Sequence, residues 1–570
     1  MIRAILAALG IWVFGTLSLE VATAAETSQP PRDSQPYANT RNALAQAIPT
    51  LTRQNRIVGL SIALVDDQAV VWAQGFGYAD KAKKIKAAPE TIYRAGSISK
   101  LFTATAAMQL VEQGKFDIDR PLQTYLPGFF IKTRFPDAGA ITPRQLMTHH
   151  SGLPGDYLKG EETAVPPEPF GELVNKLPDE YVAYPPNFIL SYSNLGVSLL
   201  GHSVETICAT SFGDCLENSL LKPLGMADSG FYSGPSVSPL MSKGYSRGLA
   251  VPQSYLRDIP AGGLNTTVLD LGRFMRMLFA DGLTDGRQVI SSATLSEMLR
   301  AQNADIPLDL DQQIGLAWAL KHTATGEKLA WHDGSIGSFH SFLATLPEHK
   351  LGVVVLANSD TAAGVVNELG SDALESMLSE KSGGPGPVAS FHAATLTPLS
   401  LPDFPGYYAS GNFGLIGISE KYGRMRIQLN GRSYPIKPHT DGRVGFRFPQ
   451  LGAVTLRRAN LSEREVLTIE GPQKRQLLGE KIPQTPLPMI WRHRAGKYRV
   501  IDEDNIVLRL GIQNGFLVLS GFGPNRVLTP VSDSEAIIAG LGRGLGETIT
   551  FENRDGVEVV RYSGYLAKRK

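Results

Sequence analysis

The pattern of apolar and polar positions changes about two thirds of the way along the chain. In the first part, strand-like runs lie near both ends of a long region whose middle has mainly helical spacing. The predicted elements are a helix at 40–53, strands at 59–66, 69–75, 341–346 and 351–357, and a helix at 362–378. This order predicts an α/β (α+β) domain over residues 38–380, whose sheet is assembled from the two ends of the domain.

The last third reads as an all-β region. Its short alternating runs are separated by Gly, Asn-Gly and Asp-Gly turns, which is typical of hairpins. A Gly- and Pro-rich linker at 381–400 precedes it. The region also repeats weakly, with a Pro-rich joint at 483–488 between the two copies. We therefore predict two β-barrels, at 401–485 and 489–570, and the alternative is one larger barrel over 401–570.

Residues 1–25 have the features of a signal peptide. Arg3 supplies a positive start, an apolar run follows over 4–19, and Ala22-Thr23-Ala24 matches the small-x-small cleavage pattern. The alternative is an uncleaved membrane anchor. No later run approaches the roughly 18 apolar residues of a membrane span. The sequence thus predicts a periplasmic or secreted protein with no membrane span after cleavage.

Charge and cysteine content indicate which partners, disulfides and metal sites to expect. Of the 570 residues, 55 are Lys or Arg and 54 are Asp or Glu, so the net charge is +1 and gives no reason to expect a nucleic-acid partner. The two cysteines, Cys208 and Cys215, lie seven residues apart around a short Gly-containing segment. Under oxidising conditions this spacing favours a local disulfide, with two buried thiols as the alternative. No His stands at metal-ligand spacing from the pair, so no metal site is predicted.

One motif offers a nucleophile beside a base. Ser97 and Lys100 open the stretch 96–111, whose apolar spacing predicts a buried helix starting at the serine. Residues three apart share a helix face, so the Lys100 amine can reach the Ser97 hydroxyl. The backbone N–H groups left unpaired at a helix start can also stabilise an oxyanion. The alternative interpretation is a capping serine with a solvated lysine.

Two other motifs add polar groups. Tyr192 and Asn194 stand just before an apolar run, where a phenol can relay a proton and an amide can both donate and accept hydrogen bonds. His332, Gly334 and Ser335 open a Gly-rich turn before the strand at 341–346. Each motif alone also fits an ordinary loop or hairpin turn.

Together, the three motifs resemble the serine penicillin-recognising superfamily. The likeness is closest to the group of class C β-lactamases, D-alanyl-D-alanine carboxypeptidases, D-aminopeptidases and related esterases. That group carries Ser-x-x-Lys, then Tyr-x-Asn, then Lys-Thr-Gly or His-x-Gly. Three supporting stretches also look like the family, at 146–154, 223–226 and 260–264, and the resemblance covers roughly residues 40–380.

The resemblance implies a role for each residue. Ser97 would be the acylated nucleophile, and Lys100 and Tyr192 would share the proton transfers, with the general base left open between them. Asn194 would orient the substrate, and the backbone N–H groups of Ser97 and Ser335 would form the oxyanion hole. His332 and Gly334 would lie on the substrate side. This route implies no metal or organic cofactor.

Position 332 departs from dedicated β-lactamases, which carry a lysine there. The reference pKa of His332 lies near 6.5, so one fixed positive charge is missing beside the nucleophile. The sequence therefore predicts an exported serine hydrolase that acts through an acyl-enzyme on an amide or ester. The favoured substrate is a D-amino-acid-containing peptide, such as one derived from peptidoglycan. The alternatives are a carboxylic ester hydrolase, a weak β-lactamase, or a non-catalytic cell-wall-binding or sensing protein.

The resemblance also implies the architecture around the site. It predicts an antiparallel sheet of about five strands flanked by helices, beside an all-helical lobe inserted between the early and late strands. The active site is expected between the sheet and this lobe, with the barrel region following as a separate part.

Overall fold

The computed structural model describes residues 36–384, except 324, and residues 404–570 apart from short gaps at 423, 430, 439–443, 449–451, 471–474, 504 and 522–523. The predicted signal peptide at 1–25 and most of the predicted linker at 381–400 lie outside the described residues. Within the described residues, no helix is both long and apolar enough to cross a membrane.

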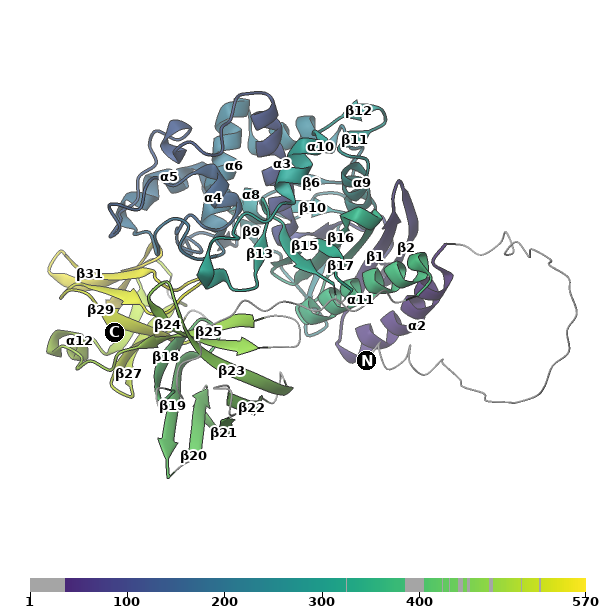
Figure 1. Cartoon of the computed structure of the whole chain (residues 1–570). Coiled ribbons are helices and arrows are strands. Elements are labelled where there is room, and N and C mark those ends of the chain that lie inside the picture. Colours follow the sequence, from purple (N-terminus) through teal and green to yellow (C-terminus); the bar gives the residue numbers. More distant parts are fainter. Residues whose placement is uncertain are drawn as a thin grey trace, which may run out of the picture.

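Strands from both ends of the first domain pair in one antiparallel sheet (Figure 1). Its order is β13 (Gln313–Ile314), β14 (Ala319–His322), β15 (Lys328–Ile336), β16 (Phe339–Leu346), β17 (Leu351–Ala357), β1 (Gly59–Asp66), β2 (Ala69–Asp80) and β3 (Ile85–Lys86). Near the middle of the sheet, β1 pairs with β17, from Leu60 opposite Ala357 to Asp66 opposite Leu351. Both strands are apolar along almost their whole length because both faces of the sheet are covered.

The sheet has eight strands rather than the expected five or so. Its five long strands, from β15 through β2, each have seven or more residues. The three additional strands, β13, β14 and β3, have two to four residues, too few to show an alternating pattern in the sequence.

Helices cover the two faces of the sheet (Figure 1). α2 (Ala38–Gln54) and α11 (Ala363–Ser382) share one hydrophobic cluster with β1, β16 and β17. α11 continues two residues beyond the predicted domain end at 380. On the opposite face, α9 (Val268–Phe279) and α3 (Ser99–Glu112) belong to a second, larger cluster that extends into the inserted lobe.

The inserted lobe is mainly helical. Its other helices are α4 (Pro143–Met147), α5 (Leu173–Lys176), α6 (Asn194–Cys208), α7 (Phe212–Leu216), α8 (Ile259–Gly262) and α10 (Ser292–Met298). It differs from the expected all-helical lobe by short strands: β4 (Tyr93–Arg94), β5 (Glu162–Thr163), β6 (Gly230–Phe231), β7 (Gly244–Ser246), β8 (Leu249–Val251), β9 (Tyr255–Leu256), β10 (Leu264–Thr266), β11 (Leu283–Thr284) and β12 (Arg287–Gln288). The predicted disulfide between Cys208 and Cys215 is confirmed and ties the end of α6 to α7.

The C-terminal region forms two closed eight-stranded barrels, as preferred over the single-barrel alternative. Barrel 1 consists of β18 (Gly406–Ser410), β19 (Gly414–Lys421), β20 (Arg424–Leu429), β21 (Arg432–Pro438), β22 (Val444–Phe448), β23 (Gly452–Leu461), β24 (Arg464–Glu470) and β25 (Arg475–Ile482). Barrel 2 consists of β26 (Gly496–Val500), β27 (Val507–Gln513), β28 (Phe516–Ser520), β29 (Arg526–Pro530), β30 (Glu535–Ile538), β31 (Thr548–Arg554), β32 (Val557–Tyr562) and β33 (Tyr565–Arg569). Pairing of the first strand with the last closes each barrel. Between them, α12 (Met489–His493) buries Trp491 in the core of barrel 2.

Candidate active site

Ser97 lies in a 3₁₀ turn, η1 (Gly96–Ile98), directly before α3. The buried helix thus begins at Ser99, two residues later than predicted. Gly96 has a φ of +54°, and a Cβ there would lie 2.8 Å from the Ser335 nitrogen. A Cβ on Gly334 would lie 2.1 Å from the carbonyl oxygen of Ala95. Both glycines are required because β15 runs in close contact with the turn that holds Ser97.

Among the described residues, no strand pairs with the edge of β15 beside this turn. β14 pairs with β15 at residues 328–331, so the edge from His332 onward faces η1. The Ser335 nitrogen lies close to the turn, because a Cβ on Gly96 would approach it to 2.8 Å. The backbone nitrogens of Ser97 and Ser335 therefore border the nucleophile together, which is the arrangement an oxyanion hole requires.

Lys100 is completely buried beneath the nucleophile. Its Nζ lies 3.0 Å from Ser97 Oγ and donates to the Ala261 carbonyl at 2.7 Å. Burial lowers the pKa of Lys100 to about 7, and the positive charge of Arg543 acts in the same direction. A substantial fraction of the amine is therefore neutral at pH 7 and can accept the Ser97 proton.

Tyr192 covers Lys100. The ring centroid lies 4.8 Å from the Lys100 Nζ, and the ring of His149 packs on Tyr192 with centroids 4.2 Å apart. Burial raises the pKa of Tyr192, while a hydrogen bond with Ser97 opposes the shift. The phenol therefore remains protonated at neutral pH. Sequence alone left the general base open between Lys100 and Tyr192, and these opposite shifts favour Lys100.

His332 lies near Tyr192, with the ring centroids 6.2 Å apart. Its ring is buried, and Nδ1 is hydrogen-bonded to the carbonyl oxygen of Asp333. Burial, followed by the charge of Lys100, lowers the pKa of His332 to about 4. His332 is therefore neutral at pH 7, and position 332 supplies no fixed positive charge.

Asn194 begins α6, and its side chain faces a carboxylate rather than the Ser97 hydroxyl. Its Nδ2 donates to Asp156 Oδ1 at 2.8 Å. The same carboxylate accepts from Arg543 Nη2 at 2.9 and 2.8 Å. Asn194 is thus connected through Asp156 to a residue of barrel 2.

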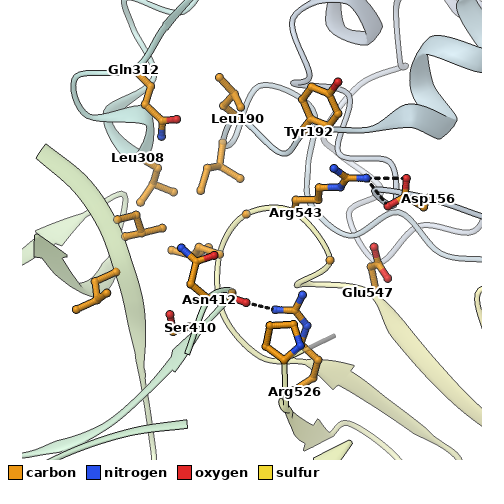
Figure 2. A pocket seen from close by; sticks show the side chains of 18 of the residues that line it. Asp156, Leu190, Tyr192, Leu308, Gln312, Ser410, Asn412, Arg526, Arg543 and Glu547 are labelled. Atoms are coloured by element: carbon orange, nitrogen blue, oxygen red, sulfur yellow. Dashed lines mark hydrogen bonds and ion pairs between the residues drawn. The ribbon is translucent and has the colours of Figure 1, made fainter. Parts of the chain in front are cut away.

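Arg543 and Asp156 are two site residues that sequence reasoning missed. Arg543 lies on the loop 539–547, which joins β30 to β31 and reaches Tyr192 (Figure 2). Its guanidinium carbon is 5.0 Å from the centre of the Tyr192 ring. The loop contains four glycines with positive φ, at 540, 542, 544 and 546. A single charge between alternating glycines was the signal that could have drawn attention to this loop.

The structure therefore brings Ser97, Lys100, Tyr192, His332 and Ser335 together, with Asn194 linked through Asp156. A search of the described residues finds no group of three or more His, Cys, Asp or Glu side chains that could hold a metal ion. The cluster provides a nucleophile, a nearby amine with a lowered pKa, a phenol and two backbone donors. This set can transfer an acyl group to serine and then to water.

Sequence comparison agrees with this geometry. The family model for β-lactamase matches residues 44–374. Protein flp of Staphylococcus aureus is 25% identical over 312 residues, which cover 54% of this chain and 60% of the relative. Penicillin-binding protein 4 of Amycolatopsis lactamdurans is 28% identical over 331 residues, covering 56% of this chain and 84% of the relative. The chain thus spans about 60% of the length of the flp relative.

Solved structures share the fold of a larger part of the chain. The octameric penicillin-binding protein homologue from Pyrococcus abyssi has a TM-score of 0.53 at 24% identity, covering 77% of this chain and 99% of the homologue. SurE has a TM-score of 0.55 at 22% identity, also covering 77% and 99% of the two chains. With the family model matching more than half of its residues, the chain belongs to the β-lactamase family.

Proposed function

We propose that this protein is an exported hydrolase that cleaves amides or esters through an acyl-enzyme on Ser97, with D-amino-acid-containing peptides as preferred substrates. The observation that carries the proposal is the contact between Lys100 Nζ and Ser97 Oγ beneath the Tyr192 ring. An amine with a pKa of about 7 at this distance can take up the serine proton during attack.

In the acylation step, Ser97 Oγ attacks the substrate carbonyl while Lys100 accepts its proton. The Ser97 and Ser335 backbone nitrogens stabilise the negative charge that develops on the carbonyl oxygen. The proton then passes to the leaving amine or alcohol, a transfer that the protonated Tyr192 can relay. In the second step, water replaces the leaving group and the same residues release the acyl product.

The substrate preference rests on the charge of the site. A β-lactam or a carboxy-terminal peptide presents a carboxylate next to the reacting bond, and His332 gives it no fixed cation. An aminoacyl substrate has no carboxylate at that place. The same neutral site also fits a simple ester, so a carboxylic ester hydrolase is the second candidate.

The test is hydrolysis of a D-aminoacyl anilide and a short-chain acyl ester by the mature protein and by Ser97→Ala. The matched control is Ser198→Ala, since Ser198 is buried in α6 and its hydroxyl has no hydrogen-bond partner among the described residues. We expect Ser97→Ala to lose at least about a thousandfold in kcat and Ser198→Ala to retain activity. Faster cleavage of the anilide supports a peptidase, and faster cleavage of the ester alone supports an esterase. A mature protein as inert as Ser97→Ala on both compounds would overturn the proposal.

A further inference from the structure

A cavity of about 670 Å³ lies where the catalytic domain meets both barrels (Figure 2). This volume is within the range of sites for small molecules and short peptides. Tyr192 forms part of its wall, so the cavity reaches one residue of the catalytic cluster, while Ser97 and Lys100 lie outside its lining. It extends from there between the loop 539–547 of barrel 2 and the β18–β19 turn of barrel 1.

The cavity combines an aliphatic wall with a few polar groups. The aliphatic side chains come from all three parts of the protein and include Leu158, Ile189, Leu308, Leu477, Leu478 and Leu541. Ser410, Asn412 and Gln312 add neutral groups that can hydrogen-bond to a peptide backbone. Aliphatic side chains with separated amide and hydroxyl groups suit a peptide in which each residue presents both an apolar side chain and a polar main chain.

The charged groups at the two ends of the cavity differ in their partners. Near Tyr192, Arg543 is neutralised by both oxygens of Asp156. Both oxygens of Glu547 are also occupied, by the Gly155 nitrogen and the Tyr562 hydroxyl. At the far end, Arg526 donates from Nη1 to the carbonyl oxygen of Gly411 at 2.7 Å, and no described carboxylate forms an ion pair with it.

We propose that this cavity holds the leaving part of the substrate, a short peptide with aliphatic side chains whose C-terminal carboxylate pairs with Arg526. The inference rests on the proposed function, since it places the reacting bond at Ser97 and the released peptide beyond Tyr192. A guanidinium can pair with a carboxylate through two parallel N–H···O bonds, and the aliphatic wall strengthens this attraction by excluding water. Arg526 thus gives the substrate carboxylate a cation at a distance from the bond that is cleaved.

The experiment compares D-alanyl-leucyl-leucine with its C-terminal amide, using kcat/KM for each peptide. We expect the wild type to prefer the free acid by roughly 10- to 100-fold, the range for a hydrogen bond to a charged group. Arg526→Gln should bring the ratio of the two kcat/KM values close to one. Arg526→Lys should restore most of the preference for the free acid. Arg509→Gln is the control, because Arg509 is an exposed arginine on β27 of the same barrel, and it should keep the wild-type ratio.

A second measurement needs no variant. Leucyl-leucine should inhibit cleavage of a D-alanyl anilide by the wild type competitively and at least tenfold more strongly than leucyl-leucine amide. Equal inhibition, equal cleavage of acid and amide, or a preference that survives Arg526→Gln would each overturn the inference. A wild type that cleaves the anilide but neither peptide would also overturn it while the proposed function stands. A wild type that does not cleave even the anilide would remove the proposed peptidase function and the inference with it.

Discussion

Both barrels are closed by eight antiparallel strands, but they meet the catalytic domain in different ways. Barrel 2 sends the loop 539–547 to Tyr192, where Arg543 pairs with Asp156. Its buried Glu547 accepts a hydrogen bond from Gly155 at 3.0 Å. Barrel 1 contributes apolar contacts and the ion pair between Arg475 and Asp311.

The comparison shows that two barrels of the same architecture can differ in their role at the active site. The strands of each barrel build a similar closed wall. At the catalytic cluster the difference is the loop 539–547, which barrel 2 extends to Tyr192. Because a loop can lengthen or change sequence while the strands keep their pairing, barrel 2 can shape the active site without loss of its own fold. Barrel 1 then forms the far side of the cavity. Four variants test this division of roles.

The largest effect is expected from Gly546→Val. Gly546 has a φ of +72°, and a Cβ there would lie 2.7 Å from the Ala183 carbonyl oxygen. The loop must therefore withdraw from the catalytic domain, and we expect kcat/KM to fall roughly 100-fold, as displaced catalytic groups typically cause. The control is Gly431→Val in barrel 1, where φ is +74° and a Cβ would meet nothing within 4 Å. Both variants carry similar backbone strain, so equal losses of kcat/KM would contradict the special role of the loop.

Arg543→Gln should change the pH dependence of the reaction. The charge of Arg543 helps to lower the pKa of Lys100, whereas the carboxylate of Asp156 raises it. Removal of the arginine leaves Asp156 uncompensated, so both effects raise the Lys100 pKa. If Lys100 must be neutral to act as the base, the acidic limb of the kcat/KM profile should move to higher pH by roughly one unit. Activity at pH 7 should fall about fivefold, because the neutral fraction of Lys100 drops by that factor when its pKa rises from about 7 by one unit. An unchanged limb in a folded Arg543→Gln variant would argue against this electrostatic role.

Glu547→Gln should alter the pH dependence of stability. Burial raises the pKa of Glu547 to about 7, so the folded protein binds this proton more tightly than the unfolded chain, whose ordinary value is 4.5. The contribution of Glu547 to the free energy of unfolding is fully present below pH 4.5. It is lost as the pH rises through 7, by about 1–3 kcal/mol in all. Glutamine mimics the protonated form. The difference in Tm between pH 5 and pH 8 should therefore be smaller in the variant than in the wild type, and an equal difference would refute the assignment.

The smallest effect is expected from Arg475→Gln in barrel 1. Asp311 keeps its hydrogen bond from the Arg475 backbone nitrogen at 2.7 Å when the guanidinium is removed. We expect a loss of about 1 kcal/mol in unfolding free energy, measured by denaturant titration, and an unchanged pH profile of kcat/KM. A shift of the profile like that of Arg543→Gln would show that barrel 1 influences the catalytic cluster in the same way as barrel 2.

Much of the catalytic cluster could be predicted because its residues stand in short motifs. Ser97 and Lys100 are three residues apart, and a helical turn is enough to bring them together. The apolar runs at 341–346 and 351–357 identified β16 and β17 because buried strands need continuous apolar residues. Both predictions depend only on residues that are close together in the sequence.

The rest could not be predicted because it depends on contacts between distant segments. Arg543 is 387 residues from Asp156, and nothing in the periodicity of barrel 2 indicates which loop meets the catalytic domain. Asn194 was expected at the substrate, but its partner Asp156 is 38 residues earlier in a loop without a repeating pattern. The direction of the pKa shifts at Lys100 and Tyr192 likewise follows from burial by the whole lobe rather than from neighbouring residues.

The pairing of β1 with β17 also constrains the order in which the protein folds. Residues 59–66 pair with residues 351–357, so most of the domain must be synthesised before β1 and β17 can form their hydrogen bonds. Contacts this far apart in sequence slow folding, because a long loop must be ordered before the strands gain their hydrogen bonds. A chain that ends before Leu351 leaves one edge of β1 unpaired and available to other chains. Truncated products of this gene should therefore aggregate, whereas the complete domain covers that edge with its own last strand.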